Sequence, residues 1–481
     1  MATKMVSVAV ALLLLATSCG GGESGRAPVP EGPCVVGRIH DIPIETKVSG
    51  RRPPEVDAEQ FQTQWPIKHV VFLMKENRTF DNFFAVFPGA NGSTTGRLMG
   101  EKVELRPCLR QIIPTDLLHD YPMALRSWNK GKMDGFACVQ QPDLRERPVP
   151  LKVVFSPDCK ISDYKRAEAY SRASPEDIPN YWHWAETFTL ADNFFTSALG
   201  PSFPNHLFSI AAQSAGTHDN PTETAQGVQR RQQRGFQKSW GCDAPISTKV
   251  GVETRAGTVK QVHPCFDIRT LGDEMNEAGI PWASYAATSR QDGYIWSAYD
   301  AIRHIRETDQ WEKRLFPVDQ LVSDIEENRL PPVTWVTPRF LYSDHPDVNL
   351  CDGENWSTQV INSVMESDMW KDTAIFITWD DWGGFYDHVA PKQIDRFGLG
   401  FRAPLMVISP YAKKGFIDHE PGEFSSVLRF VEDNWGLGQL TDRDREANNL
   451  TQHFDFSQEP REPDVLPLRD DCQRARDRQV I

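Results

Sequence analysis

Short, almost continuous apolar runs constrain the fold of this chain more than any other feature of its sequence. Each run is four to eight residues long, the usual length of a strand, and lacks the polar alternation of a strand with one face in water. Such runs are typical of strands buried on both faces of a parallel sheet. They occupy residues 67–74, 281–285, 333–336, 374–379 and 404–408.

Helical patterns separate these runs. Apolar residues recur at helical spacing over 358–369 and 425–435. Strands that alternate with helices predict an α/β fold, because the crossover helices cover both faces of a parallel sheet. We therefore expect a three-layer α/β/α sandwich with a largely parallel sheet.

Composition divides the 481 residues into four segments. Residues 61–456 contain every strand run and are predicted to form one large domain. Within it, residues 216–262 are polar and include a cluster of arginines, so we expect an insertion or cap over one face of the sheet. The other segments are a leader, a Gly- and Pro-rich linker with an irregular lead-in, and a polar C-terminal tail, at residues 1–19, 20–60 and 457–481.

The leader is typical of a bacterial export signal. Lys4 precedes a largely apolar run from Met5 to Leu15, which is too short to span a bilayer as a helix. Small residues then lead to Cys19, as in the lipobox of bacterial lipoproteins, and a glycine-rich tether follows. We expect an exported cell-envelope protein that contacts the membrane only through a lipid on Cys19. Plain secretion is the alternative, because Ala16 replaces the usual lipobox Leu.

The net charge of −14 narrows the choice of partners. Lys and Arg number 52, against 66 Asp and Glu. This balance argues against a dedicated nucleic-acid binder, which normally has a basic surface, and gives no attraction to anionic bilayers. Hydrophobic residues make up 40% of the chain, which is ordinary for a globular protein and excludes wholesale disorder. We expect a monomer.

Acidic and amide side chains directly follow two of the strand runs. The first run leads to Glu76 and Asn77, and the fourth leads to Asp380 and Asp381. In α/β sheets, ligands bind beyond the carboxyl ends of the strands, and adjacent carboxylates there repel unless a cation lies nearby. The sequence therefore predicts a divalent metal site, with Ca, Mg, Mn or Fe permitted by oxygen ligands. A solvated turn is the alternative.

Two loops contain candidate groups for covalent and acid–base chemistry. Ser202 lies in a Gly/Pro turn before a predicted helix, where backbone N–H groups can assist an exposed hydroxyl. A helix N-cap is the alternative role for this serine. His345 follows the run at 333–336 and is a candidate proton donor, with an incidental loop histidine as the alternative.

Six motifs occur in order along the chain: IKHVVFLMKENRTFDNFF at 67–84, WNKGKMDGF at 128–136, ADNFFTSALGPSFPNH at 191–206, SDHPD at 343–347, TWDDWGGFYDHV at 378–389 and FRAPLMVISPYAKKGFIDH at 401–419. Together they closely resemble the bacterial phosphoesterase family of phospholipases C and related acid phosphatases, in the alkaline-phosphatase superfamily. The resemblance spans about residues 65–437. It implies an alkaline-phosphatase-like fold and the hydrolysis of phosphate esters or phospholipids.

The resemblance also implies a metal site and a nucleophile. Glu76, Asn77, Asp380 and Asp381 match the ligands of one catalytic divalent metal ion. Ser202 matches the hydroxyl nucleophile and would also contact the metal. The implied mechanism passes through a phosphoserine intermediate that water then hydrolyses.

Further positions are assigned on the same resemblance. His345 matches the histidine that protonates the leaving alcohol, and His119 falls near another active-site histidine. His388 is expected to hydrogen-bond in the site as a substrate-binding residue. Arg78 and Lys132 are candidates for phosphate binding, with pairing to nearby carboxylates as the alternative.

Two departures from the family pattern bear on the substrate. Many phospholipase-type members have Asp-Glu where this chain has Asp380-Asp381, which leans toward the acid-phosphatase branch. His206 replaces an arginine that many members and the sulfatases contain, which argues against a sulfatase. A non-catalytic, ligand-binding surface lipoprotein on the same fold is the alternative function.

The cysteine count fits an exported protein. If Cys19 of the nine cysteines is lipidated, eight remain, and an even number permits up to four disulfides. Proximity in sequence favours Cys108–Cys138 and Cys242–Cys265. A zinc site is the alternative, although no C-x-x-C pair supports it.

Overall fold

The computed structural model describes residues 51–107, 116–138, 168–235, 237–254, 256–470 and 472. The predicted leader with Cys19, most of the predicted linker, and Cys108 lie outside these residues. Within the described residues, no helix is both long enough and apolar enough to cross a membrane.

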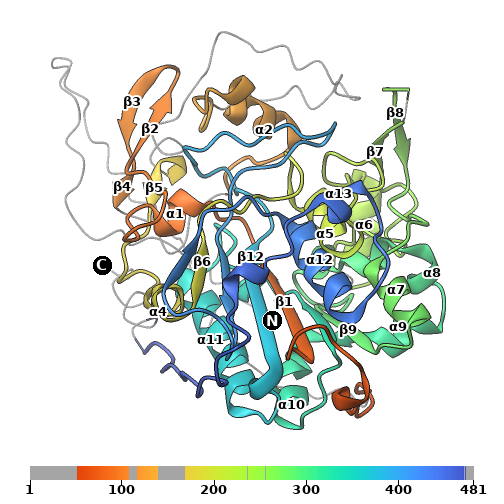
Figure 1. Ribbon diagram of the computed structural model, residues 1–481. Coiled ribbons are helices and arrows are strands. Elements are labelled where there is room, and N and C mark those ends of the chain that lie inside the picture. Colours follow the sequence, from red (N-terminus) through yellow and green to blue (C-terminus); the bar gives the residue numbers. More distant parts are fainter. Residues whose placement is uncertain are drawn as a thin grey trace, which may run out of the picture. The chain divides into compact units, whose positions relative to one another are not determined.

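An eight-stranded sheet forms the core of the fold (Figure 1). Five adjacent strands are parallel, β13 is antiparallel to both of its neighbours, and the last two strands are parallel to each other. The prediction of a largely parallel sheet is confirmed. In spatial order the strands are β10 (Leu315–Pro317), β9 (Trp282–Ala286), β11 (Val333–Val336), β1 (His69–Lys75), β12 (Thr373–Trp379), β13 (Leu405–Ile408), β6 (Thr189–Ala191) and β14 (Phe416–Asp418).

All five predicted runs are strands of this sheet, and their ends agree to within two residues. The direction of β13 was not predicted. Residues 380–404, which connect β12 to β13, contain no helix, and a connection without a crossover helix favours an antiparallel return. Strands β6, β10 and β14 are three residues each, which is too short to produce a recognisable pattern.

Helices cover both faces of the sheet, as the three-layer prediction requires. Along β1, Val70, Phe72 and Met74 pack into one hydrophobic cluster, and Val71 and Leu73 pack into another. This alternation is that of a strand buried on both faces. The first cluster includes α5 (Ser202–Ala211), α7 (Leu271–Glu277) and α12 (Phe424–Trp435), and the second includes α4 (Pro179–Thr187), α10 (Leu321–Glu326) and α11 (Leu350–Glu366).

Shorter elements surround this core. Within the described residues, the remaining helices are α1 (Phe80–Phe84), α2 (Tyr121–Trp128), α6 (Ala225–Gln233), α8 (Arg303–Arg306), α9 (Asp309–Arg314) and α13 (Asp442–Glu446). Three two-stranded sheets are formed by β2 (Thr95–Leu98) with β3 (Glu101–Glu104), β4 (Arg106–Pro107) with β5 (Ser171–Arg172), and β7 (Val250–Glu253) with β8 (Val259–Val262). The 3-10 helices are η1 (Ala58–Gln60), η2 (Asn129–Gly131), η3 (Tyr294–Trp296), η4 (Ala298–Ala301), η5 (Val318–Gln320), η6 (Phe340–Tyr342), η7 (Trp370–Asp372) and η8 (Thr451–His453).

The cysteines confirm one predicted pairing and add another. Cys242 and Cys265 form a disulfide with their Cα atoms 4.5 Å apart. Cys351, at the start of α11, is bonded to Cys472, which lies 121 residues further along the chain. Proximity in sequence could not reveal that second pair. Cys138 is also disulfide-bonded.

The predicted polar tail is attached to the body of the protein. Asn180 of α4 donates a hydrogen bond to Pro467 O (3.1 Å), and Asn362 of α11 donates one to Leu466 O (2.7 Å). Arg469 pairs with the buried Glu354 of α11 at 2.8 Å. Together with the Cys351–Cys472 disulfide, these contacts hold the tail against two helices of the core.

Glu432 of α12 provides a test of the packing. Its side chain is fully buried, and neither carboxylate oxygen has a hydrogen-bond partner. Burial and the neighbouring Asp444 raise the pKa of Glu432 from 4.5 to about 10. The folded protein therefore holds this proton more tightly than the unfolded chain, so the free energy of unfolding falls as pH rises above 4.5.

We expect Glu432→Gln, which stays neutral, to raise the thermal unfolding midpoint by about 2 °C or more at about pH 8 and by much less at about pH 4.5. Differential scanning calorimetry at both pH values measures the difference. The exposed Glu446 of α13 provides the control, Glu446→Gln. An equal gain at both pH values would contradict the burial argument.

Candidate active site

The two acidic segments meet because β1 and β12 are neighbours in the sheet. Lys75 and Trp379 are partners in their register, so Glu76 and Asp380 are the next residues on adjacent strands. The backbone N–H of Asp380 donates to Lys75 O at 3.0 Å and continues the ladder by one bond. On the other side of β1, β11 leads through η6 to the loop that contains His345.

Ser202 completes this cluster from the first residue of α5. Its Oγ lies 3.1 Å from Asp381 Oδ2 and 3.4 Å from Glu76 Oε2. The N-cap alternative for Ser202 is wrong, because the N-cap is Pro201 and no side chain caps this helix. The hydroxyl instead lies at the positive end of the helix dipole, which favours anions.

Asn77 links the two strand ends. Its Nδ2 donates to Asp381 Oδ1 at 2.5 Å, and its backbone N–H donates to Asp380 Oδ1 at 2.8 Å. The Asn77 backbone has a φ of 67°, a left-handed conformation that Asn tolerates better than most residues. Gly383 packs against it so closely that a Cβ there would lie 2.5 Å from Asn77 O. The turn after β12 therefore requires glycine at this position.

The cluster has a surplus of buried negative charge. Glu76, Asp380 and Asp381 are all fully buried. Burial and the two aspartates raise the pKa of Glu76 well above its usual range, and burial with Asp380 raises the pKa of Asp381 to about 7. Asn77 Oδ1 and Asp380 Oδ2 are buried without a hydrogen-bond partner. Unpartnered oxygens beside repelling carboxylates fit a divalent cation, and the solvated-turn alternative is wrong for this pair.

His206 belongs to the same cluster, although sequence reasoning gave it no role there. It lies four residues after Ser202 and therefore on the same face of α5. Its Nε2 is 2.9 Å from Glu76 Oε1 and 3.7 Å from Asp380 Oδ2. Burial lowers the pKa of His206 to about 4, so the ring is neutral at ordinary pH. The four-residue spacing from Ser202 was the available signal.

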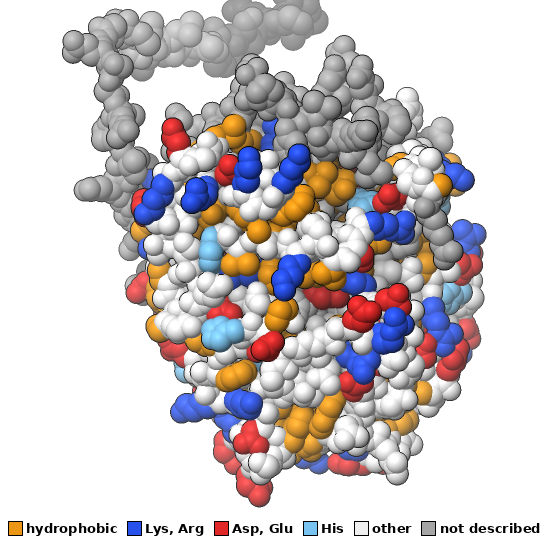
Figure 2. All heavy atoms as spheres, turned by 45° about the horizontal axis from the view of Figure 1, so that its top comes forward, with side chains coloured by type: hydrophobic (Ala, Val, Ile, Leu, Met, Phe, Trp, Pro, Cys, Tyr) orange, Lys and Arg blue, Asp and Glu red, His pale blue; other side chains and the backbone are white. Residues whose placement is uncertain are grey.

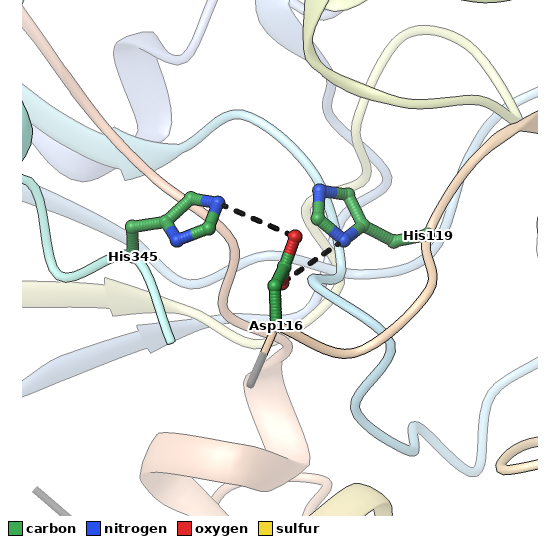
Figure 3. A group of neighbouring side chains, drawn as sticks. All are labelled: Asp116, His119 and His345. Atoms are coloured by element: carbon green, nitrogen blue, oxygen red, sulfur yellow. Dashed lines mark ion pairs between the residues drawn. The ribbon is translucent and has the colours of Figure 1, made fainter. Parts of the chain in front are cut away.

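A second group lies beside the cluster and contains the two predicted histidines (Figure 3). Asp116 lies between the two imidazoles, 3.5 Å from His119 Nδ1 and 3.9 Å from His345 Nε2. Burial alone would lower the pKa of His119. Asp116 and the buried carboxylates outweigh burial and raise the pKa of His119 to about 9, so this ring is cationic.

The ring of His345 is held on both sides. Its Nδ1 bonds to Asp347, and its ring packs against Phe340 with centroids 5.1 Å apart. The centroids of the His119 and His345 rings are 5.8 Å apart. Nε2 of His345 is left facing Asp116. Neither Asp116 nor Asp347 received a role from the sequence, because a loop carboxylate has no distinctive spacing.

The three predicted substrate contacts differ in their surroundings. Arg78 is fully buried, and its Nε and Nη2 donate to the carbonyl of Asp344. Lys132 is exposed in the turn after η2. His388 Nδ1 lies 2.7 Å from Asp81 Oδ2, within a group of ion pairs that also contains the buried Arg402.

The face of the molecule seen in Figure 2 has mixed charge. Figure 2 views the molecule obliquely from the top of Figure 1 and shows basic and acidic side chains interspersed. The surplus negative charge of the chain is thus not gathered into one exposed patch on this side. Part of it belongs to the buried carboxylates.

Known proteins are similar to this chain over most of its length. The chain is 26% identical over 461 residues to the hemolytic phospholipase C of Pseudomonas aeruginosa, covering 81% of this chain and 56% of that protein. It is 26% identical over 445 residues to phospholipase C B of Mycobacterium tuberculosis, covering 82% and 78%. The chain therefore spans just over half the length of the Pseudomonas protein.

Solved structures are only distantly similar. A phosphonate monoester hydrolase from Silicibacter pomeroyi is 13% identical, with a TM-score of 0.26 over 54% of this chain and 69% of that one. The profile of the Phosphoesterase family, in contrast, matches residues 67–438. That range includes the buried carboxylates, the serine at the start of α5 and both imidazoles. The chain belongs to the Phosphoesterase family.

Proposed function

We propose that this protein is a phosphoesterase of the phospholipase C type that uses Ser202 as its nucleophile. The observation that carries the proposal is the contact between Ser202 Oγ and Asp381 Oδ2 at 3.1 Å, at the start of α5. Relatives named phospholipase C support esters of a phosphorylated headgroup as the substrate class. Phosphomonoesters are the second proposed substrate class, because the Asp380-Asp381 pair resembles the acid-phosphatase branch of the family.

Nucleophilic attack follows from the position of the hydroxyl. Ser202 O–H points its proton at Asp381, which accepts the proton as the serine oxygen forms a bond to phosphorus. The backbone N–H of Ser202, at the start of α5, holds a phosphoryl oxygen in this proposal. The next N–H, of Phe203, already donates to Asn220 Oδ1 at 2.9 Å. The bond from phosphorus to the leaving oxygen breaks, and a phosphoserine remains.

Departure of the alcohol requires a proton. In this proposal His345 Nε2–H gives its proton to the leaving oxygen, while Asp347 holds the ring through Nδ1. The cationic His119 stabilises negative charge on the phosphoryl oxygens. In the second half of the reaction, His345 removes a proton from the water that hydrolyses the phosphoserine.

A divalent metal ion is part of the proposal. Glu76, Asn77, Asp380, Asp381 and Ser202 would hold it, because their oxygens converge in one buried cluster. When bound, such an ion supplies Lewis-acid stabilisation of charge and lowers the pKa of the serine hydroxyl. Oxygen-rich ligands leave Ca, Mg, Mn and Fe open.

The three candidate substrate contacts receive different roles according to their hydrogen bonds and exposure. We assign Arg78 a positioning role, because its donors are used on the Asp344 carbonyl and on Asn82. Lys132 remains a candidate for contact with substrate, because its side chain is exposed. We assign His388 to the support of Asp81 rather than to the substrate.

We also propose that the protein acts outside the cytoplasm. The disulfides Cys242–Cys265 and Cys351–Cys472 support this location, because thiols in the cytosol are kept reduced. Anchoring through a lipid on Cys19 remains a proposal from the sequence.

Replacement of the nucleophile is the direct test of the proposed function. We expect Ser202→Ala to reduce turnover of both p-nitrophenyl phosphorylcholine and p-nitrophenyl phosphate by about 10³-fold or more. The release of p-nitrophenol with added divalent metals is measured, and the ratio of the two wild-type rates separates the two substrate classes. Ser209→Ala, on the same helix, is the control. Unchanged activity in Ser202→Ala would remove this serine as nucleophile, and an inactive wild type would favour the ligand-binding alternative.

Metal removal should have a pH-dependent effect on stability. Without a cation, the raised pKa values of Glu76 and Asp381 mean that stability is lost as pH rises, through about 7 in the case of Asp381. A bound cation offsets this repulsion. We therefore expect chelation to lower the unfolding midpoint more at about pH 8 than at about pH 5, where the acids are protonated. Differential scanning fluorimetry of the holoprotein, with and without chelator, measures this, and equal shifts would contradict it.

We expect His206 to increase the affinity of the site for metal through its contact with Glu76. We expect His206→Ala to weaken metal binding by about 10-fold or more, because the 2.9 Å bond that orients Glu76 Oε1 is lost. Ser209→Ala serves as the control, because Ser209 Oγ donates only to the His206 carbonyl within the helix. Titration of the metal-free protein with the metal that activates it measures both affinities. Equal affinity in the two variants would show that His206 has no part in the site.

A further inference from the structure

A buried carboxylate next to His345 has an unusual set of partners. Asp344 is fully buried, and its Oδ2 accepts hydrogen bonds from Tyr181 OH (2.8 Å) and Trp379 Nε1 (3.1 Å). Its Oδ1 lies 3.4 Å from Nζ of Lys75, which is also fully buried. One side chain thus contacts α4, the end of β12 and the end of β1.

The backbone of Asp344 is held as firmly as its side chain. Its carbonyl accepts from Arg78 Nε (2.9 Å) and Nη2 (2.7 Å), and its φ is 71°. A left-handed conformation at a residue other than glycine persists only where its surroundings enforce it. The preceding residue, Ser343, accepts the backbone N–H of Glu76 at 2.8 Å.

These anchors are the immediate neighbours of the metal-site residues in sequence. Lys75 and Arg78 bracket Glu76 and Asn77, and Trp379 directly precedes Asp380. The turn before His345 is therefore tied to the same two strand ends that hold the carboxylate cluster. Any shift of Asp344 would move the imidazole relative to the nucleophile.

Close approach of α11 is part of this arrangement. Gly353 presents no side chain to Asp344, and a Cβ built there would lie 1.9 Å from Asp344 Oδ1. The Gly353 carbonyl also accepts from Lys75 Nζ at 2.8 Å. A glycine in a helix lowers helix stability relative to alanine, so its presence here fits a need for space beside the carboxylate.

We propose that Asp344 is the positioning residue for His345: its buried carboxylate, held by Lys75, Tyr181 and Trp379, sets the imidazole where it can protonate the leaving oxygen. This inference rests on the proposed function. Asp344 touches no substrate atom and acts only through the turn that carries His345. It differs from Asp347, which bonds to the imidazole itself.

The proposal predicts a dependence on the leaving group. A p-nitrophenolate leaves without a proton, whereas a p-nitrobenzyl alkoxide requires one as its bond to phosphorus breaks. We therefore compare the p-nitrophenyl and p-nitrobenzyl esters of one acid, either phosphorylcholine or phosphate. The acid is the one whose p-nitrophenyl ester the wild type hydrolyses faster. Loss of the proton donor should slow the benzyl ester far more than the phenyl ester, by about 10²-fold for His345→Ala.

Asp344→Asn keeps the shape of the side chain but removes its charge from Lys75. We expect kcat for the benzyl ester to fall at least about tenfold more than kcat for the phenyl ester, with KM little changed. Gly353→Ala displaces the same carboxylate without altering it and should shift the ratio in the same direction. Gly353→Ala also provides a second test if the buried amide of Asp344→Asn prevents folding.

Asp324→Asn is the matched control. Asp324 is equally buried, accepts Tyr285 OH at 2.8 Å and lies 3.5 Å from Arg52. A loss of stability alone should lower both rates together in this variant. The same parallel loss in Asp344→Asn and Gly353→Ala, with the ratio shifted only in His345→Ala, would overturn the positioning role.

The remaining outcomes are also decisive. An unshifted ratio in His345→Ala would show that this imidazole is not the acid and would overturn the proposal with it. A wild type inactive on both esters would instead overturn the proposed function from which the inference starts. A shifted ratio in His345→Ala, Asp344→Asn and Gly353→Ala, with Asp324→Asn unshifted, supports it.

Discussion

The site depends on one electrostatic constraint: three carboxylates buried side by side at the ends of adjacent strands. Glu76, Asp380 and Asp381 are all removed from water, and burial together with their mutual repulsion raises the pKa of Glu76 and Asp381. Folding must therefore stabilise a cluster that is unfavourable by itself. A sheet can do this, because its ladder fixes the backbone independently of the side chains that follow it.

The surroundings supply positive charge and hydrogen-bond donors but leave the centre of the cluster negative. The N–H groups of Asn77 and Gly383 donate to the aspartates, and the helix dipole of α5 points its positive end at them. The cationic His119 lies beside them. Buried oxygens of Asn77 and Asp380 still lack hydrogen-bond partners. Donors on the outside and unpartnered oxygens within are what a cation-binding cage requires, which is why we propose a metal there.

Sequence reasoning located the part of the site that strands carry. The apolar runs placed β1 and β12 correctly, and residues next to a strand end inherit its position, so Glu76 and Asp380 could be predicted together. The antiparallel direction of β13 could not be predicted, because the apolar content of a strand does not depend on its direction. His206 was missed because its role depends on the helical face it shares with Ser202. Asp116 was missed because it acts through a contact between loops.

Residues on strand ends were easier to predict than residues on loops, because the two are held in place in different ways. Groups on strand ends are positioned by the backbone hydrogen bonds of the sheet, which do not depend on particular side chains. Groups on loops, such as His345, need their own anchors, and here those anchors are the buried side chains around Asp344. Because the same strand ends supply Lys75 and Trp379, the carboxylate cluster and the imidazole share one frame. A displacement of either strand end would therefore move the carboxylate cluster and the His345 imidazole together.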